Sequence, residues 1–233
     1  MWWDPATLAL DVQESAGLAQ QKILAVDERG VRAEEGVREH AVWQAERERV
    51  RATGSAPSLM VRTVTEHAAV AAAPAVEVAV ESVGAPAPRP HGKRFGTLVH
   101  AVLAAVELDA DPTGVADAAA LQGRLLGATA AEVEAATETV ARALAHPLLR
   151  QAAHAGRCRR ECAVGVKLDG DVLVEGVVDA AYLLDGEGWT VVDFKTDVEI
   201  AGRLEECRRQ VGLYAQAVTR ATGVPARGVL LRM

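Results

Sequence analysis

Aromatic residues are scarce in this chain of 233 residues, where Phe, Trp and Tyr together make up 3% of the sequence. Half of the residues are nevertheless apolar, so alanine, valine and leucine must supply most of the buried surface. Cysteine is also sparse, and three cysteines are more typical of a reducing cytoplasm than of a disulfide-linked secreted scaffold. The sequence therefore predicts a folded, cytoplasmic protein.

Three other absences exclude whole classes of function. No apolar run approaches the ~20 residues that a membrane helix needs, and the first residues lack the basic and apolar regions of a signal peptide. No G-x-x-x-x-G-K-[ST] loop is present, so this chain does not bind ATP in that manner and carries no ATPase motor. The net charge of -7 excludes a strongly cationic nucleic-acid coat protein, although it permits an acidic metal site beside a local basic track.

Residues 1–90 are predicted to form a helical leader followed by a linker. The first fifty residues have helical spacing, and the charged stretch that ends near Arg51 carries only a thin apolar stripe. Residues 58–69 suit a short strand or turn that leads into a helix. Residues 71–90 are rich in Ala, Val, Glu and Pro, a composition typical of an extended linker. We therefore expect the main domain to span residues 91–233.

This main domain is predicted to be α/β, with helices first and strands after them. The strand segments are rich in valine and are bounded by Gly and Asp turn residues. The expected helices cover Phe95–Glu107, Ala116–Gly127, Ala130–Ala145, Leu148–Ala155 and Leu204–Thr222, and the expected strands cover Cys162–Leu168, Asp171–Leu184, Trp189–Phe194 and Arg227–Met233. This order predicts an α/β core with a helical insertion.

Two carboxylates stand out because they lie on consecutive predicted strands. Asp179 follows a run of valines, and Asp193 lies in a second apolar strand, two residues before Lys195. Residues two apart on a strand share a face, so Asp193 and Lys195 point the same way. A buried carboxylate is costly unless it is paired or bound to a cation, so this pattern calls for a partner. The alternative is a surface ion pair, which would contribute less than about 1 kcal/mol.

The loop between the two strands decides whether Asp179 meets Asp193. A two-residue turn at residues 186–187 would place Asp179 opposite Phe194, on the wrong face. A loop of three or five residues, or a bulge, would place it opposite Asp193 or Lys195. If the carboxylates converge, they form a hard, oxygen-rich site that suits Mg²⁺ or Mn²⁺.

Five short motifs occur in order along the second half of the chain. They are Gly96-Thr97-Leu98-Val99-His100, Arg160-Glu161, Gly176-Val177-Val178-Asp179, Asp193-Phe194-Lys195 and Gln210-Val211-Gly212-Leu213-Tyr214. Together they resemble the RecB-type nuclease domain of the PD-(D/E)XK superfamily, and more closely the C-terminal part of an AddA-like helicase–nuclease of the UvrD/RecB type. The resemblance implies a restriction-endonuclease-like core, in which helices flank a central mixed sheet, with the helical insertion and the N-terminal helical leader added to it.

The resemblance also implies roles for the motif residues. Asp179 and Asp193 are expected to bind the metal ion, together with His100 and the backbone carbonyl of Phe194. Lys195 is expected to assist the attacking water molecule. These residues would form the catalytic centre.

Three further motif residues are expected to support the site. Gln210 and Tyr214, four apart on one helix face, would stabilise it or contact the DNA backbone. Glu161 is expected only to support, because a two-residue hairpin turn at residues 169–170 would pair it with Val178 and turn it away from the site unless a bulge intervenes.

The activity implied by the resemblance is that of a DNA exonuclease that depends on Mg²⁺ or Mn²⁺. It would act on single-stranded DNA ends in double-strand break repair or recombination, within an AddAB- or RecBCD-like complex whose helicase motor or partner subunit lies outside this chain. Three cysteines cannot supply the four that hold an iron–sulfur cluster in some relatives, so no cluster is expected. The alternative is a non-catalytic module on the same fold, which would bind or scaffold DNA ends without hydrolysing them.

Basic residues flank the motifs and are candidates for contacts with DNA phosphates. Ordinary solvated charge is an equally good interpretation of each cluster. The clusters are Lys93-Arg94, Arg157-Arg159-Arg160 and Arg203-Arg208-Arg209.

Overall fold

The computed structural model describes residues 29–71, 76–84, 90–196, 200 and 202–233. The chain forms two compact units, residues 1–57 and 58–233, and each is described by itself. The helical prediction for residues 1–28 and the proline-rich linker at residues 85–89 lie outside the described residues. No helix in the described part of the chain is long and apolar enough to span a membrane.

In the first unit, the described residues form one long helix, α2 (Val31–Ser55). No residue of α2 is buried, and its polar groups pair along its own surface. Arg49 donates two hydrogen bonds to Glu46, and the Trp43 ring stacks on His40 with 5.5 Å between the ring centroids. The helical prediction for this charged stretch is confirmed.

The second unit is built on one mixed sheet of six strands. Its strand order is β1-β4-β5-β6-β2, and β3 pairs with β4 as well. The β3–β4 and β4–β5 pairs are antiparallel, whereas the β1–β4, β5–β6 and β2–β6 pairs are parallel. The strands are β1 (Met60–Thr63), β2 (Val78–Ser82), β3 (Arg157–Leu168), β4 (Val172–Leu184), β5 (Gly188–Lys195) and β6 (Ala226–Arg232).

Strand β4 changes partner along one of its edges. β3 follows the whole of its other edge, so β5 and β1 share the remaining one. Residues 180–184 of β4 pair with β5, and residues 172–175 pair with β1. Among the described strands, none pairs with residues 176–179 on this edge. A gap in the sheet therefore opens where β4 and β5 separate.

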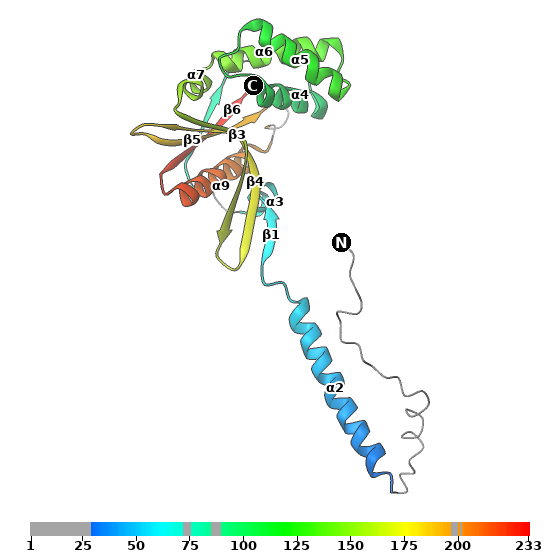
Figure 1. Ribbon diagram of the computed structural model, residues 1–233. Coiled ribbons are helices and arrows are strands. Elements are labelled where there is room, and N and C mark those ends of the chain that lie inside the picture. Colours follow the sequence, from blue (N-terminus) through cyan, green and yellow to red (C-terminus); the bar gives the residue numbers. More distant parts are fainter. Residues whose placement is uncertain (1–28, 72–75, 85–89, 197–199, 201) are drawn as a thin grey trace, which may run out of the picture. The chain divides into compact units, whose positions relative to one another are not determined.

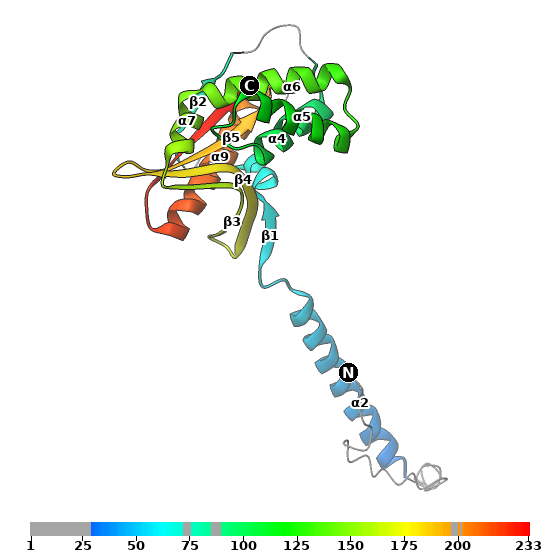
Figure 2. The ribbon, with the colours of Figure 1, turned by 45° about the horizontal axis from the view of Figure 1, so that its top comes forward.

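Four helices cover one face of the sheet (Figure 1, Figure 2). They are α4 (Lys93–Ala105), α5 (Pro112–Leu126), α6 (Ala130–Ala145) and α7 (Pro147–His154). Thr129 caps the start of α6, and Glu132 completes the capping box. Glu132 also pairs with Arg94 of α4 at 3.0 Å, so one carboxylate joins the two helices.

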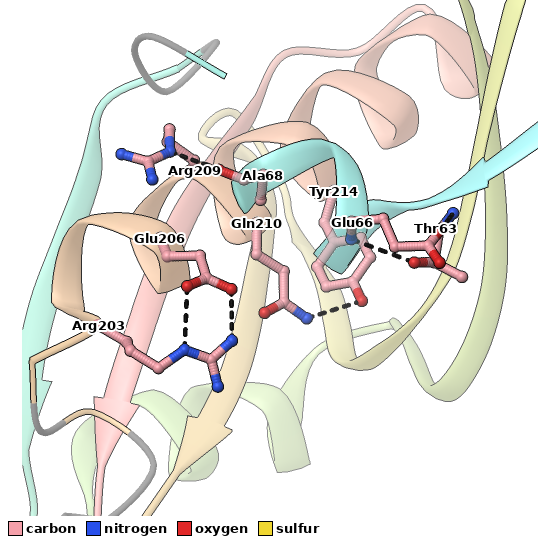
Figure 3. Close-up of polar contacts among 8 residues, drawn as sticks. All are labelled: Thr63, Glu66, Ala68, Arg203, Glu206, Arg209, Gln210 and Tyr214. Carbon is pink, nitrogen blue, oxygen red and sulfur yellow. Dashed lines mark hydrogen bonds and ion pairs between the residues drawn. The ribbon is translucent and has the colours of Figure 1, made fainter. Parts of the chain in front are cut away.

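Two helices, α3 (Val64–Val70) and α9 (Leu204–Thr222), cover the other face. Val64 and Ala68 of α3 are buried against α9 and the sheet. Arg209 of α9 donates a hydrogen bond of 2.6 Å to the Ala68 carbonyl, which ties the end of α3 to α9 (Figure 3).

The predicted α/β core with its helical insertion is confirmed. The sheet lies between two helical layers, and α6 and α9 have the predicted bounds. The strand and helix expected at residues 58–69 form β1 and α3. One prediction fails, because part of the expected linker forms β2 and pairs with β6. The compact unit begins at Ser58, so the boundary predicted at residue 90 falls inside it.

Near the middle of the two-stranded β3–β4 ribbon, the side chains that faced α9 give way to side chains that face α4. Val178 packs beneath α9, whereas Ala180 packs beneath α4, although residues two apart in a regular strand share a face. In β3, Cys158 packs on the α4 side and Val164 on the α9 side, which is the same exchange. The ladder of paired residues is interrupted at this point, where Glu161 has a positive φ of 47°.

Candidate metal-dependent active site

The β4–β5 hairpin brings Asp179 and Asp193 together. Its loop has three residues, 185–187, because Leu184 pairs with Gly188. One step beyond the last pair of the ladder, the same register places Asp179 opposite Asp193. The convergence expected for a three-residue loop is therefore confirmed, and the two-residue turn is excluded.

The carboxylate of Asp179 lies in the gap between β4 and β5. Its Oδ2 accepts a hydrogen bond of 2.7 Å from the Phe194 N–H, and its Oδ1 lies 3.5 Å from His100 Nδ1 on α4. The His100 ring meets the Phe194 ring edge-on, with 6.2 Å between the centroids. Both strands and helix α4 thus contribute to the position of one carboxylate.

Asp193 is buried, with 2% of its surface exposed. Its Oδ2 lies 2.6 Å from Lys195 Nζ but has no hydrogen bond of good geometry. Burial raises the pKa of Asp193 to about 6, the Lys195 ammonium opposes this rise, and the Asp179 charge adds to it. One ammonium group therefore does not fully compensate this buried carboxylate, which suits a second cation.

The backbone carbonyl of Phe194 points into the same gap. In an extended strand the N–H and C=O groups of one residue point to the same edge, and the Phe194 N–H points to Asp179. The next carbonyl, that of Lys195, points the opposite way and accepts a hydrogen bond of 2.9 Å from Met233 N–H. The carbonyl predicted as a ligand therefore lies on the side of the carboxylates.

The donor atoms suit Mg²⁺ or Mn²⁺ better than a metal held by side chains alone. Among the described residues, no three His, Cys, Asp or Glu side chains are grouped so as to hold a metal ion. Two carboxylates and one carbonyl remain, and Mg²⁺ usually keeps several water molecules beside one or two carboxylates. The buried Asp193 Oδ2, which lacks a hydrogen bond, fits such an ion.

Glu161 lies nearer to the site than the sequence predicted. The β3–β4 loop has three residues, 169–171, so Glu161 lies opposite Asp179 and not one residue away from it. Partial burial raises the pKa of Glu161, Asp179 raises it further, and His100 opposes the rise. The predicted register was wrong because Asp171 adopts a positive φ of 56° and extends the turn by one residue.

Helix α9 brings Gln210 and Tyr214 against the site from the opposite face. Gln210 Nε2 donates a hydrogen bond of 3.1 Å to the Tyr214 hydroxyl (Figure 3). Tyr214 is buried, and this burial raises its pKa. A Cβ at Gly176 would lie 2.8 Å from Tyr214 Cε1. The glycine of the G-x-x-D motif therefore makes room for the tyrosine of the Q-x-x-x-Y motif.

Arg160 was considered only as a motif residue and for contacts with DNA phosphates, whereas in the structure it holds the end of α4. Its guanidinium donates hydrogen bonds to the carbonyls of Leu103, at 3.1 Å, and Val106. Arg160 therefore ties the strand that carries Glu161 to the helix that carries His100. The only signal in the sequence is its position directly before the motif glutamate.

Most of the basic residues considered for phosphate contacts have partners within the second unit. The residues engaged in this way are Arg94, Arg160, Arg203, Arg208 and Arg209. Arg157 and Arg159 of β3 are exposed and form no side-chain hydrogen bond or ion pair within the described residues. Only part of the expected basic track is thus free for phosphate groups.

Comparison with known families agrees with this geometry. The family model of the PD-(D/E)XK nuclease superfamily matches residues 78–233, more than half of the chain. Its members generally use divalent metal ions, and a central sheet flanked by helices is consistent with its restriction-endonuclease-like fold. A search of the curated proteins finds no match. By its sequence, its sheet and its paired carboxylates, the chain belongs to the PD-(D/E)XK nuclease superfamily.

Proposed function

We propose that the second unit is a metal-dependent deoxyribonuclease that hydrolyses phosphodiester bonds at single-stranded DNA ends. The observation that supports this best is the convergence of Asp179, Asp193 and Lys195 where β4 and β5 separate. Hydrolysis of a phosphodiester needs an activated water molecule and positive charge near the phosphate. Two carboxylates that can hold a divalent ion, with a lysine beside them, provide for both.

The residues of the site have distinct roles in this proposal. The ligands of Mg²⁺ or Mn²⁺ would be Asp179, Asp193 and the Phe194 carbonyl, and His100, whose Nδ1 lies 3.5 Å from Asp179 Oδ1, would have to shift to complete the set. The bound ion would polarise the phosphodiester and lower the pKa of a water molecule in its shell. Lys195 would orient the attacking water and stabilise the negative charge that develops on the phosphate.

Three neighbours would keep this centre in place. Glu161 lies opposite Asp179 and would support it from the neighbouring strand. Gln210 and Tyr214 would hold the α9 face of the site through their mutual hydrogen bond. Contact of either residue with the DNA backbone remains part of the proposal.

The order of the five motifs supports a more specific assignment. We propose that the unit is the nuclease domain of an AddA-like helicase–nuclease, which acts in double-strand break repair or recombination in the cytoplasm. A helicase motor or partner subunit would deliver the single-stranded end to the site. Such delivery would compensate for the weak DNA affinity expected of an isolated unit in a chain of net charge -7.

Cleavage of end-labelled single-stranded DNA with Mg²⁺ or Mn²⁺ tests the proposed activity. Asp193→Ala and Lys195→Ala should each abolish cleavage. Asp185→Ala is the matched control, because Asp185 is an exposed aspartate in the loop of the same hairpin, and it should cleave like the wild type. DNA binding without hydrolysis at any metal concentration would instead favour the non-catalytic end-binding module. Cleavage that survived both site substitutions would refute the assignment.

A further inference from the structure

A groove lies on the α9 side of the sheet, next to the proposed active site but not part of it. Its volume is about 450 Å³, and it follows β3 from Gly165 to Arg157 beside the last turns of α9. Val178, Ala181 and Trp189 form an apolar floor. The groove therefore presents aliphatic surface at the margin of the sheet.

The strand that borders the groove has an open edge. Among the described strands, β3 pairs with β4 alone, and its twelve residues make it longer than the outer strands β1 and β2, with four and five residues. Residues 162–166 contain no charge and no proline, the usual protection of an edge strand. Arg220 already donates a hydrogen bond of 2.6 Å to the Lys167 carbonyl, at the hairpin end of β3. The edge beyond it is available for another strand.

Two arginines stand at the far end of the groove. Arg157 and Arg159 both line it, so they share one face of β3. Both are exposed, and neither has a side-chain hydrogen bond or ion pair within the described residues. An occupant of this groove therefore needs apolar groups at one end and negative charge at the other.

We propose that the open edge of β3 binds an extended, acidic and apolar peptide segment of a partner protein, which adds as a strand to β3 with its alternate side chains on the groove side. Strand addition uses the N–H and C=O groups of an open edge, and pockets beside it select the side chains. A nucleic acid fits less well, because it cannot pair both kinds of backbone group. Single-stranded nucleic acids also bind on exposed aromatic rings, whereas Trp189 is 9% exposed.

The face exchange at Glu161 gives the peptide a defined pattern. Of the β3 residues at the groove, Arg157, Arg159, Cys162 and Val164 belong to the face that Val164 presents to α9, with spacings of two, three and two residues, whereas Ala163 and Gly165 alternate with them. An antiparallel partner strand should therefore carry two apolar residues two apart and, three residues later, two acidic residues two apart. A parallel strand would need the reverse order.

Fluorescence anisotropy with a labelled peptide, Thr-Val-Thr-Val-Thr-Thr-Asp-Thr-Glu-Thr, tests the antiparallel pattern. The titration uses the full chain without metal or DNA, so its result is independent of the proposed nuclease activity. We expect a dissociation constant on the order of 10 to 100 µM, typical of a small and partly polar interface. Replacing the two acidic residues of the peptide by lysine should weaken binding at least about tenfold.

Charge reversal on the protein identifies the surface. Arg157→Glu combined with Arg159→Glu should weaken peptide binding at least about tenfold. The fold should be retained, because both residues are exposed and their side chains form no hydrogen bond or ion pair within the described residues. Arg124→Glu, at an exposed position of α5 without a side-chain partner there, is the matched control and should bind like the wild type. The reversed peptide distinguishes parallel from antiparallel addition.

Three results would overturn the proposal. They are failure of both peptide orders to bind at millimolar concentration, equal binding of the lysine peptide, and binding that survives the double reversal. Binding of labelled oligothymidylate that is lost on the double reversal, without peptide binding, would make the groove a nucleic-acid site instead.

Discussion

At the scale of single residues, the buried Asp193 carboxylate of the proposed site destabilises the folded state when no metal ion is bound. Asp193 is buried among apolar strands, and its negative charge is costly there. Lys195 compensates only part of this cost, since the pKa of Asp193 stays raised to about 6. A divalent ion would supply the missing charge, so metal binding should raise the melting temperature of the wild type. The same ion should stabilise Asp193→Asn much less, which calorimetric melting with and without Mn²⁺ would show.

The pH dependence of stability should reveal the Asp193 carboxylate directly. Its pKa is about 6 in the folded protein and 3.8 without burial. Its contribution to stability is therefore fully present below pH 3.8 and is lost as the pH rises through 6. When the pH is lowered from 7.5 to 5, the unfolding free energy of the metal-free wild type should rise by about 1 kcal/mol relative to that of Asp193→Asn. Urea denaturation at the two pH values measures this, and a constant difference would contradict the buried-charge argument.

Gly176 should be intolerant of a side chain because of the tyrosine behind it. An added Cβ would lie 2.8 Å from Tyr214 Cε1 and 3.0 Å from Val64 Cγ2. Gly176→Ala should therefore lower the unfolding free energy by about 1 to 3 kcal/mol, as overpacked cores do. Gly165→Ala, on the neighbouring strand, is the control, because its nearest contact would be an ordinary 3.8 Å. Equal stability of the two variants would show that Tyr214 moves aside without cost.

At the scale of elements, Arg160 should couple the end of α4 to the metal site. Arg160→Ala removes its hydrogen bonds to the carbonyls of Leu103 and Val106. We expect a loss of about 2 kcal/mol in stability and weaker Mn²⁺ binding, because α4 carries His100. The control is Arg142→Ala, which removes only an exposed contact with Glu138. Calorimetry that finds unchanged Mn²⁺ affinity in Arg160→Ala would limit this arginine to a structural role.

The link between α4 and α6 should weaken in acid. Arg94 and the capping groups of Thr129 lower the pKa of Glu132 to about 2. The resulting stabilisation is present above pH 4.5 and is lost as the pH falls toward 2. Glu132→Gln should therefore melt below the wild type at pH 7, and the gap between the two melting temperatures should close from pH 4.5 downward. A gap that stays constant down to pH 3 would argue against this ionic link.

Local sequence patterns predicted most helices and strands. They did not predict the elements that form only by pairing with a distant part of the chain. The bounds of α6 follow from Thr129 at its start and a His-Pro pair at its end, so this helix could be predicted to the residue. Strand β2 could not, because its partner β6 lies far along the chain: Val78 pairs with Gly228. A valine-rich segment within a proline-rich stretch has no local feature that specifies such a pairing.

The site shows the same division between local and distant information. Spacing along two strands was sufficient to predict that Asp193 and Lys195 lie together and that Asp179 can join them. The position of Glu161 depended on one extra loop residue, and alternation alone cannot predict that. The contacts of Arg160 with α4 span more than fifty residues, so no pattern within β3 could indicate them.

At the scale of the whole molecule, the compact unit is larger than the family match. The match begins at residue 78, whereas the unit begins at Ser58 and includes β1 and α3. Val64 and Ala68 are buried there, and Arg209 bonds to the Ala68 carbonyl. A domain cut at the family boundary therefore loses part of its core.

Truncation tests this boundary. A fragment of residues 58–233 should unfold cooperatively with a melting temperature close to that of the full chain. A fragment of residues 78–233 should melt at least several degrees lower, because it loses two buried side chains and the hydrogen bond to α9. Equal melting of the two fragments would show that β1 and α3 are dispensable.

The exchange of faces in the β3–β4 ribbon constrains how this chain can change in length. The side chains change sides at opposite positions of the two strands, Glu161 in β3 and Asp179 in β4. The pairing register of β3 with β4 is therefore the same before and after this point. Deleting one residue from a single strand would invert every side chain beyond the deletion relative to its partner. Only paired deletions or insertions keep the two strands in step. Length changes within this ribbon should therefore be tolerated only in pairs.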